Sequence, residues 1–273
     1  GALTIRHQGN TAERVPCDDS NLLLRAMRLA ANRLGQCSPQ GRIIVDSKIP
    51  VGVGMGSSAA AVVAGLLLGA AQCGKPVETG QLLRWAEEIE GHIDNAAAAC
   101  LGGLAFALCN NTERVITFKT RFPDDIRLVL VTPSVPVPTR EARRVLPQNY
   151  DRADVLHTLQ RTSLLAATCA SGKFDLVPEL FDDRLHHPYR QQLVPGIARA
   201  LEHRQEGLLG VAISGSGSSV IAFTRGNEEQ IARELQRIFR QEGVETEVLF
   251  TSADNQGAVV RTVPPDSSQA ARQ

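Results

Sequence analysis

The chain has 273 residues, which is enough for one large or two moderate domains and for a sizeable hydrophobic core. Its 29 Lys and Arg side chains balance 29 Asp and Glu side chains, so the formal net charge is zero. This balance argues against a nucleic-acid partner, because such partners are held by excess positive charge. With 43% hydrophobic and 21% charged residues, the composition also excludes a globally disordered chain.

Neither a membrane segment nor a secretory signal is predicted. The longest apolar stretches, residues 59–71 and 96–109, are interrupted by glycine and fall short of the roughly 20 residues that cross a bilayer. The six cysteines contain no Cys-x-x-Cys pair, so we expect reduced thiols and a cytoplasmic protein without a membrane partner. They are Cys17, Cys37, Cys73, Cys100, Cys109 and Cys169.

The first half of the chain mixes predicted helices and strands. Apolar side chains at helical spacing predict helices over residues 21–35, 59–72 and 79–90. Runs rich in β-branched residues predict strands over 42–49, 104–108, 115–118 and 126–132. Prolines at 133, 136 and 138 follow the last strand, so a domain boundary is expected near residues 120–135.

The second half shows the same mixture. It predicts helices over 140–145, 154–171, 173–181, 196–206 and 228–241, and strands over 209–213, 220–224 and 244–251. Helices packed on mixed sheets indicate the α+β class. The tail after residue 262 is polar and is expected to be disordered.

A glycine-rich loop joins the first of these strands to the Ala-rich helix. Glycines stand at alternate positions 52, 54 and 56, and Ser57 and Ser58 follow them. Glycine lets backbone N–H groups approach an anion closely, and the amino end of a helix carries partial positive charge. The pattern predicts a phosphate-binding loop; the alternative is a tight turn whose glycines serve packing.

Three common loop motifs do not fit. A Walker A loop needs a Lys after its last glycine, and no Lys follows Gly56. A dinucleotide-binding fingerprint needs glycine where Ser57 stands, and a serine-hydrolase elbow needs glycine where Ala60 stands.

The loop instead resembles that of a known family. Pro50-Val51-Gly52-Val53-Gly54-Met55-Gly56-Ser57-Ser58-Ala59-Ala60 is similar to the Pro-x-x-x-Gly-Leu-Gly-Ser-Ser-Ala-Ala loop of the GHMP small-molecule kinases, with Met55 in place of Leu. Further segments resemble signatures of the homoserine kinases within that superfamily: Glu90-Gly91-His92-Ile93-Asp94-Asn95-Ala96, Gly102-Gly103, Thr139-Arg140-Glu141-Ala142-Arg143 and Asp183-Arg184-Leu185-His186-His187-Pro188-Tyr189-Arg190. Ser214-Gly215-Ser216-Gly217 resembles the late glycine-rich motif, with Ser218 where Pro is usual.

This resemblance, collinear over residues 20–260, implies a two-domain GHMP kinase fold. A ribosomal-protein-S5-like N-terminal domain is expected over residues 1–125 and a ferredoxin-like C-terminal domain over 126–262, followed by a tail at 263–273. Members of the family begin with a strand and a motif that supplies an Asn and an Asp to the amino alcohol. The chain starts downstream of that motif, so we expect the first strand and first motif to be missing.

The resemblance also implies ATP and Mg²⁺ as cofactors. The predicted nucleotide-binding residues are Pro50, Val51, Gly52, Val53, Gly54, Met55, Gly56, Ser57, Ser58 and Ala59. Mg²⁺ prefers few protein oxygens together with phosphate oxygens, and the resemblance implies Ser58 and a helix-end carboxylate. We choose Glu88 over Glu87, with a solvated helix face as the alternative role for Glu88.

Asp94 is a candidate for catalysis because it precedes an Ala run that looks buried. Its carboxylate could take the proton of the acceptor hydroxyl, or orient that hydroxyl beside Asn95 and His92. A helix cap is the alternative, and transfer without a general base also stays open.

An amino-acid acceptor carries a carboxylate, which the planar guanidinium of arginine binds with two hydrogen bonds. The candidates are Arg143 and Arg190, with help from Thr139. Gly215 and Gly217 are expected to let backbone approach the acceptor or the phosphate, unless they form an ordinary hairpin turn.

These residues predict ATP-dependent phosphorylation of the side-chain hydroxyl of L-homoserine, a step toward threonine. Another kinase of the superfamily, acting on mevalonate, a sugar or shikimate, is the first alternative. A non-catalytic sensor that kept the fold is the second. The expected partner is a small molecule, and a homodimer is implied by the family alone.

Overall fold

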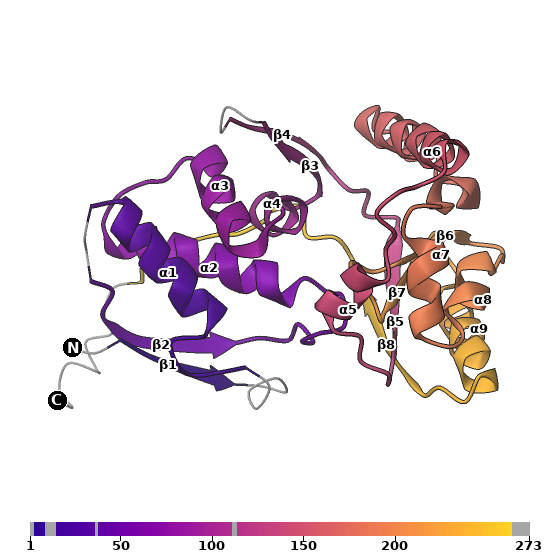
Figure 1. Ribbon diagram of the computed structural model, residues 1–273, viewed down its shortest axis with the longest axis horizontal. Helices are drawn as coiled ribbons and strands as arrows, with labels where there is room; N and C mark the ends of the chain where they lie inside the picture. The colour runs from indigo at the N-terminus through magenta and orange to yellow at the C-terminus, as the bar shows by residue number, and fades with distance from the viewer. Residues whose placement is uncertain (1–2, 9–14, 36–37, 111–113, 264–273) are drawn as a thin grey trace.

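A computed structural model of the protein describes residues 3–8, 15–35, 38–110 and 114–263. Figure 1 shows two units side by side, with the N-terminal half in indigo and purple and the C-terminal half in pink to yellow. No helix in these described ranges has the length and apolarity needed to cross a membrane. The tail predicted at residues 263–273 lies, except for its first residue, outside the described residues.

The N-terminal unit has four helices and two two-stranded sheets among its described residues. Its elements are β1 (Leu3–Gln8), α1 (Leu22–Arg33), β2 (Gly41–Asp46), α2 (Ser57–Gln72), α3 (Thr79–Glu90), α4 (Asp94–Leu101), β3 (Leu104–Cys109) and β4 (Val115–Thr120). Strand β1, which the sequence did not predict, pairs in parallel with β2 so that Leu3 lies opposite Gly41. Strands β3 and β4 form an antiparallel pair.

Helices α1 and α2 pack with their backbones unusually close. A Cβ atom on Gly65 would lie 2.2 Å from the carbonyl oxygen of Leu23, and one on Gly69 would lie 2.5 Å from that of Met27. Small residues at these positions let the helices touch, and Val62, Leu66 and other apolar side chains fill the core around them. This packing fixes the position of α2, whose first turn follows the glycine-rich loop.

The C-terminal unit is built on one antiparallel sheet in the order β6-β7-β5-β8. Its elements are β5 (Arg127–Pro133), α5 (Thr139–Arg144), α6 (Arg152–Ala170), the 3₁₀ helix η2 (Pro178–Phe181), α7 (His187–Arg190), the 3₁₀ helix η3 (Gln191–Leu193), α8 (Ile197–Glu202), β6 (Leu208–Ile213), β7 (Val220–Thr224), α9 (Glu228–Gln241) and β8 (Thr246–Thr251). The buried side chains of α9 pack on the sheet, among them Ile231, Leu235 and Phe239.

The helix predicted over residues 173–181 is wrong for its first five residues. The structure has only the short 3₁₀ helix η2 there, and Val177 is extended with φ −129° and ψ 151°. Pro178 explains the difference, because a proline lacks the N–H donor and disfavours helical backbone in the residue before it.

The last described residues return to the N-terminal unit, although the sequence analysis placed residues up to 262 in the C-terminal domain. We call residues 252–263 the strap. Its Asp254 carbonyl accepts the Gly103 N–H at 2.7 Å, and its Ala258 N–H donates to the Cys100 carbonyl at 3.1 Å. Figure 1 shows the yellow strap passing behind the N-terminal helices. A Cβ atom on Gly102 would lie 2.4 Å from the Gly257 nitrogen, so the predicted Gly102-Gly103 signature makes room for the strap.

The cysteines differ in part from the expected reduced thiols. Cys17, Cys100, Cys109 and Cys169 are free. Cys73, just after α2, is disulfide-bonded, and Cys37 lies outside the described residues. A helical pattern around Cys73 could not reveal this bond, because it depends on where the rest of the chain folds.

Candidate active site

The glycine-rich loop leads from β2 into α2 and leaves the first turn of the helix free of a side-chain cap. Gly52, Gly54 and Gly56 all have left-handed backbone, with φ of 79°, 85° and 73°. Gly56 is the N-cap residue of α2 and makes no side-chain hydrogen bond to it. The first-turn N–H groups and the helix dipole are therefore available to an anion.

The three glycines are not equivalent. A Cβ atom on Gly52 or Gly56 would meet nothing within 4 Å, whereas one on Gly54 would lie 2.0 Å from the Ser214 carbonyl oxygen. The phosphate-binding interpretation therefore fits Gly52 and Gly56, while the packing alternative describes Gly54. The sequence could not separate these roles, because all three glycines have the same spacing.

Ser58 faces Glu90 rather than the predicted Glu88. Its hydroxyl donates to the Glu90 carboxylate at 2.5 Å. Glu88 instead forms an ion pair of 3.0 Å with Arg33, and both side chains are substantially exposed. The structure brings Glu90, not Glu88, into hydrogen-bond contact with Ser58. Residues two apart on a helix lie about 160° apart around its axis, so the two carboxylates face different sides, and the assignment of Glu88 to Mg²⁺ stays a prediction. Glu88 therefore lies on a solvated face of α3, which is the alternative role considered for it in the sequence analysis.

Asp94, Asn95 and His92 lie close together at the start of α4. The Asp94 carboxylate accepts the Asn95 N–H at 2.7 Å, and its Oδ1 is 2.8 Å from His92 Nδ1. The Asp94 side chain is 77% exposed. Among these three, Asn95 lines the large cavity described next, whereas Asp94 and His92 do not.

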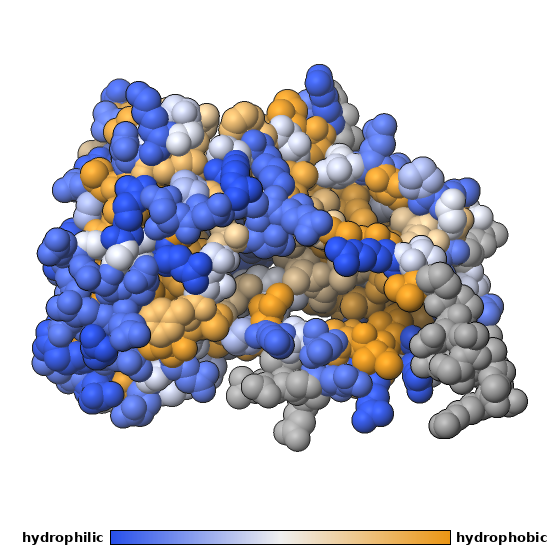
Figure 2. Space-filling model, turned by 180° about the vertical axis from the view of Figure 1, so that it is seen from behind, coloured by the Kyte–Doolittle hydropathy of each residue, from blue (hydrophilic) through white to orange (hydrophobic). Residues whose placement is uncertain are grey.

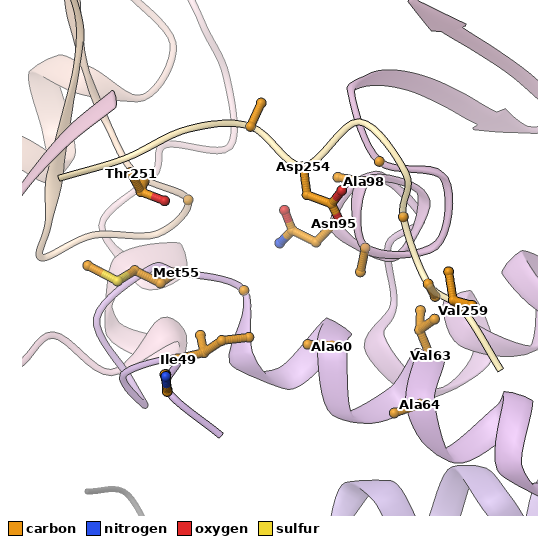
Figure 3. Close-up of a pocket in the computed structure, with 18 of the residues that line it drawn as sticks. Ile49, Met55, Ala60, Val63, Ala64, Asn95, Ala98, Thr251, Asp254 and Val259 are labelled. Carbon is orange, nitrogen blue, oxygen red and sulfur yellow. The ribbon is translucent and has the colours of Figure 1, made fainter. Parts of the chain in front are cut away.

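A cavity of about 1040 Å³ lies between the two units beside the loop. Figure 2 shows the hollowed region from behind, with hydrophobic residues on its walls. Its lining comes from the loop, one face of α2, α4, the Ser214–Gly215 segment, the end of β8 and the strap. Figure 3 shows Asn95 of α4 and Asp254 of the strap on one side of the cavity, with Ile49 and Ala60 on the other. Helix α2 contributes Ala60 and Ala64 to the lining of the cavity.

The predicted acceptor residues gather on the second glycine-rich loop, residues 214–217. Arg190 donates through Nη1 to the Gly215 carbonyl at 3.0 Å and through Nε to the Ala142 carbonyl at 3.3 Å. The Thr139 hydroxyl lies 3.3 Å from the Ser216 hydroxyl. Burial lowers the pKa of Arg190, and the charge of nearby Arg143 acts in the same direction. The two guanidinium groups therefore share one region.

Asp183, just before α7, and His187, its first residue, hold this helix, which carries Arg190. Burial alone would raise the pKa of Asp183, but hydrogen bonds from His186 and the Leu185 N–H outweigh it and hold the pKa at about 2. Burial lowers the pKa of His187, whose neutral Nε2 accepts the Ile213 N–H at 3.3 Å. These contacts tie α7 to the end of β6, directly before residues 214–217.

Sequence reasoning missed two residues of this arrangement. Glu90 stands in the quoted Glu90-Gly91-His92 segment, where its position just before the left-handed Gly91 marks it as the last residue of α3. Ser214 was quoted as part of a motif but given no role of its own. Its hydroxyl donates to the Gly54 carbonyl at 2.9 Å, across 160 residues of sequence. Only the fold brings that pair together.

Two family models match the chain, one in each unit. A family model described as the GHMP kinases N terminal domain matches residues 21–103, and one described as GHMP kinases C terminal matches residues 165–241. The chain belongs to the GHMP kinase family. The predicted two-domain α+β fold of that family is thereby confirmed.

Several relatives of this GHMP kinase are homoserine kinases. That of Deinococcus radiodurans is 37% identical over 248 residues, which cover 89% of this chain and 80% of the relative. The homoserine kinase of Carboxydothermus hydrogenoformans is 34% identical over 258 residues, which cover 94% of this chain and 84% of the relative. The crystal structure of homoserine kinase from Cytophaga hutchinsonii matches with a TM-score of 0.79 at 27% identity, covering 94% of this chain and 84% of that one.

Proposed function

We propose that this protein transfers the γ-phosphoryl group of ATP to the side-chain hydroxyl of L-homoserine, giving O-phospho-L-homoserine and ADP. Family membership and the homoserine kinases among its relatives support this reaction. The structural observation that carries the proposal is that one loop, residues 214–217, contacts both the phosphate-binding loop and Arg190. A phosphate donor and an acceptor with a carboxylate would meet beside it.

The triphosphate would bind at residues 52–58. Open space beside Gly52 and Gly56 lets a phosphate approach the backbone N–H groups, and no side chain caps α2. The helix dipole adds attraction for the negative charge. This assignment follows the predicted nucleotide-binding residues, with Gly54 assigned to support of the loop.

Ser58 and Glu90 fit Mg²⁺ in their donor chemistry. They present a hydroxyl and a carboxylate oxygen in contact with each other at the start of α2, and Mg²⁺ takes a few such oxygens together with phosphate oxygens. Within the described residues, no group of three or more His, Cys, Asp or Glu side chains could hold a metal by itself. When bound, Mg²⁺ would neutralise charge on the β- and γ-phosphates.

The acceptor carboxylate would bind at Arg143 and Arg190, with Thr139 beside them. Burial and, more weakly, the charge of Arg143 lower the pKa of Arg190, whereas Asp183 and Tyr150 act in the opposite direction. A carboxylate bound there would likewise favour the charged guanidinium. A sugar offers these arginines no carboxylate, so they favour an acceptor with a carboxylate, such as an amino acid, over a sugar.

In the reaction, the acceptor hydroxyl oxygen forms a bond to the γ-phosphorus while the bond to the β,γ-bridging oxygen breaks and ADP leaves. Asn95 lines the cavity and would orient the hydroxyl, whose proton passes to a γ-phosphate oxygen. Asp94 is exposed and already accepts a bond from the Asn95 backbone, so we assign it and His92 the task of fixing the start of α4.

A substrate panel tests the proposal. The purified full chain is incubated with ATP, MgCl₂ and homoserine, mevalonate, galactose or shikimate, and ADP release is followed together with ³¹P NMR of the product. The matched control is 3-amino-1-propanol, which keeps the hydroxyl and amine of homoserine at the same spacing but lacks the carboxylate. We expect O-phosphohomoserine to form and the control to react poorly.

Two results would contradict the proposal. Turnover of mevalonate, galactose or shikimate with homoserine inert would assign the protein to another GHMP kinase activity. Binding of ATP without turnover of any panel member would support the non-catalytic sensor.

A further inference from the structure

We propose that Ser214 is a positioning residue that couples the two ligand sites, so that Mg·ATP and homoserine bind more tightly together than separately. The inference rests on the proposed function for the identity of the two ligands. Its structural basis is the contact between the two glycine-rich loops, which come from different units of the protein.

The first part of the argument is the closeness of the loops. Gly54 has left-handed backbone, and its Cα approaches residues 214–217 so nearly that a Cβ atom would also lie 2.9 Å from the Gly217 carbonyl oxygen. On the other side, a Cβ atom on Gly215 would lie 2.9 Å from the Gly54 carbonyl oxygen. Neither backbone can move closer to the other, so a displacement of one loop toward its partner must displace the partner as well.

The second part is a hydrogen bond that reaches between the units. The Ser214 hydroxyl donates to the Gly54 carbonyl at 2.9 Å, and the Ser219 N–H donates to the Val53 carbonyl at 3.3 Å. The Ser214 backbone already bonds within its own turn, to the Ser219 carbonyl and the Gly217 N–H. Its side chain therefore adds a link to Gly54 that the turn itself does not need.

The third part is the connection from this loop to the acceptor side. Gly215 accepts a bond from Arg190, and Ser216 lies beside Thr139. The N–H of Ile213, directly before the loop, is held by His187 on the same helix as Arg190. Ile213, Gly215 and Ser216 thus contact side chains of α7 or α5. The residue between them, Ser214, contacts Gly54.

These contacts have a thermodynamic consequence. A phosphate bound at residues 52–58 orders the first loop, and the Ser214 bond transmits that order to the loop that holds Arg190. The second ligand then loses less conformational freedom on binding, and by linkage each ligand strengthens the other by the same factor. Couplings between ligand sites are commonly about 5- to 150-fold.

Calorimetric titration measures this factor directly. Homoserine is titrated into the full chain with and without a non-hydrolysable ATP analogue and MgCl₂, and the ratio of the two Kd values is the coupling factor. In Ser214→Ala we expect the factor to fall to near 1, with smaller changes in the Kd of each ligand alone. The matched control is Ser171→Ala, whose exposed hydroxyl bonds within the end of α6 and should leave the factor unchanged.

A second pair of variants separates the effect of the contact between the loops from the effect of replacing a left-handed glycine. Gly54→Ala and Gly52→Ala carry the same penalty for left-handed φ, but the methyl group of Gly54→Ala alone meets Ser214. Gly54→Ala should therefore lower the coupling factor further than Gly52→Ala. Equal factors in the two variants would overturn the inference.

Hydrogen–deuterium exchange tests the contact without any ligand. Ser214→Ala should speed exchange of backbone amides in residues 50–57, and Ser171→Ala should not. If the wild-type chain phosphorylates homoserine but Ser214→Ala changes neither the coupling factor nor the exchange, the inference is wrong and the proposed function stands. If the wild-type chain neither binds nor phosphorylates homoserine, the proposed function fails and the coupling to homoserine fails with it, whatever the exchange result shows about the contact between the loops.

Discussion

The proposed nucleotide side and the proposed acceptor side of the site are built in different ways. The nucleotide side consists of one continuous segment, residues 50–58, in which backbone N–H groups and the first turn of α2 would provide the binding surface. The acceptor side is assembled from α5, α7 and residues 214–217, which are far apart in the sequence and meet through Arg190 and Ser216.

Because of this difference, we expect the two sides to respond differently to amino-acid substitution. A continuous loop with left-handed glycines keeps its local shape through backbone geometry. An assembled site depends on the packing of every element that supplies a side chain. Four predictions, from the largest expected effect to the smallest, test or refine the contrast.

The largest effect is expected from Glu90→Gln. Because Glu90 contacts Ser58 where Mg²⁺ is proposed to bind, kcat/KM should fall by about 100- to 1000-fold, as when one charge-stabilising group is lost. Initial rates of ADP release at several MgCl₂ concentrations measure it. The matched control, Glu88→Gln, removes a surface ion pair with Arg33 and should retain nearly full activity. A loss in Glu88→Gln alone would restore the sequence-based assignment.

Arg190→Ala should act mainly on the acceptor. We expect KM for homoserine to rise by about 10- to 100-fold, the size of a lost hydrogen bond to a charged group, with a smaller change in KM for ATP. Steady-state kinetics with each substrate varied in turn measure the two constants. Arg199→Ala, which removes an exposed ion pair with Glu242, is the control. An unchanged KM for homoserine would remove Arg190 from the acceptor site.

Gly65→Ala tests the packing that holds α2 and hence the nucleotide side. Its Cβ atom would lie 2.2 Å from the Leu23 carbonyl, so the free energy of unfolding should fall by about 1 to 3 kcal/mol. Urea denaturation provides the measurement. Gly80→Ala in α3 meets its nearest atom at 3.8 Å and should instead stabilise the protein by up to about 1 kcal/mol. Equal effects of the two changes would mean that the α1–α2 contact is looser than described.

The smallest effect is expected at Asp183, whose contacts hold the segment that carries Arg190. Its pKa of about 2 in the folded protein lies below the ordinary 3.8, so it stabilises the fold above pH 3.8. That contribution, at most about 2 kcal/mol, is lost as the pH falls from 3.8 toward 2. Asp183→Asn should therefore lower the free energy of unfolding at pH 7, and its difference from wild type should shrink below pH 4.

Urea denaturation at several pH values checks this prediction. The exposed Asp124, paired with Arg121, provides the control, since Asp124→Asn should change the free energy of unfolding by less than about 1 kcal/mol. A difference between Asp183→Asn and wild type that stays constant from pH 7 to pH 3 would show that its hydrogen bonds do not depend on its charge.

The sequence by itself determined most of the elements and the character of the nucleotide side. Apolar spacing predicted α1, α3 and α9 within a few residues, and three alternate glycines before an Ala-rich helix predicted the loop that leads into α2, for which phosphate binding is proposed. These features depend on neighbours a few residues apart, so local backbone geometry and side-chain periodicity are sufficient to predict them.

The tertiary structure decided which side chains meet. The sequence led us to choose Glu88 over Glu87, whereas the packing of α3 against α2 brings Glu90 to Ser58. The bond from Ser214 to Gly54 and the return of the strap to Gly103 join segments more than 100 residues apart. Such contacts arise from the balance of packing over the whole chain, and no local pattern records them.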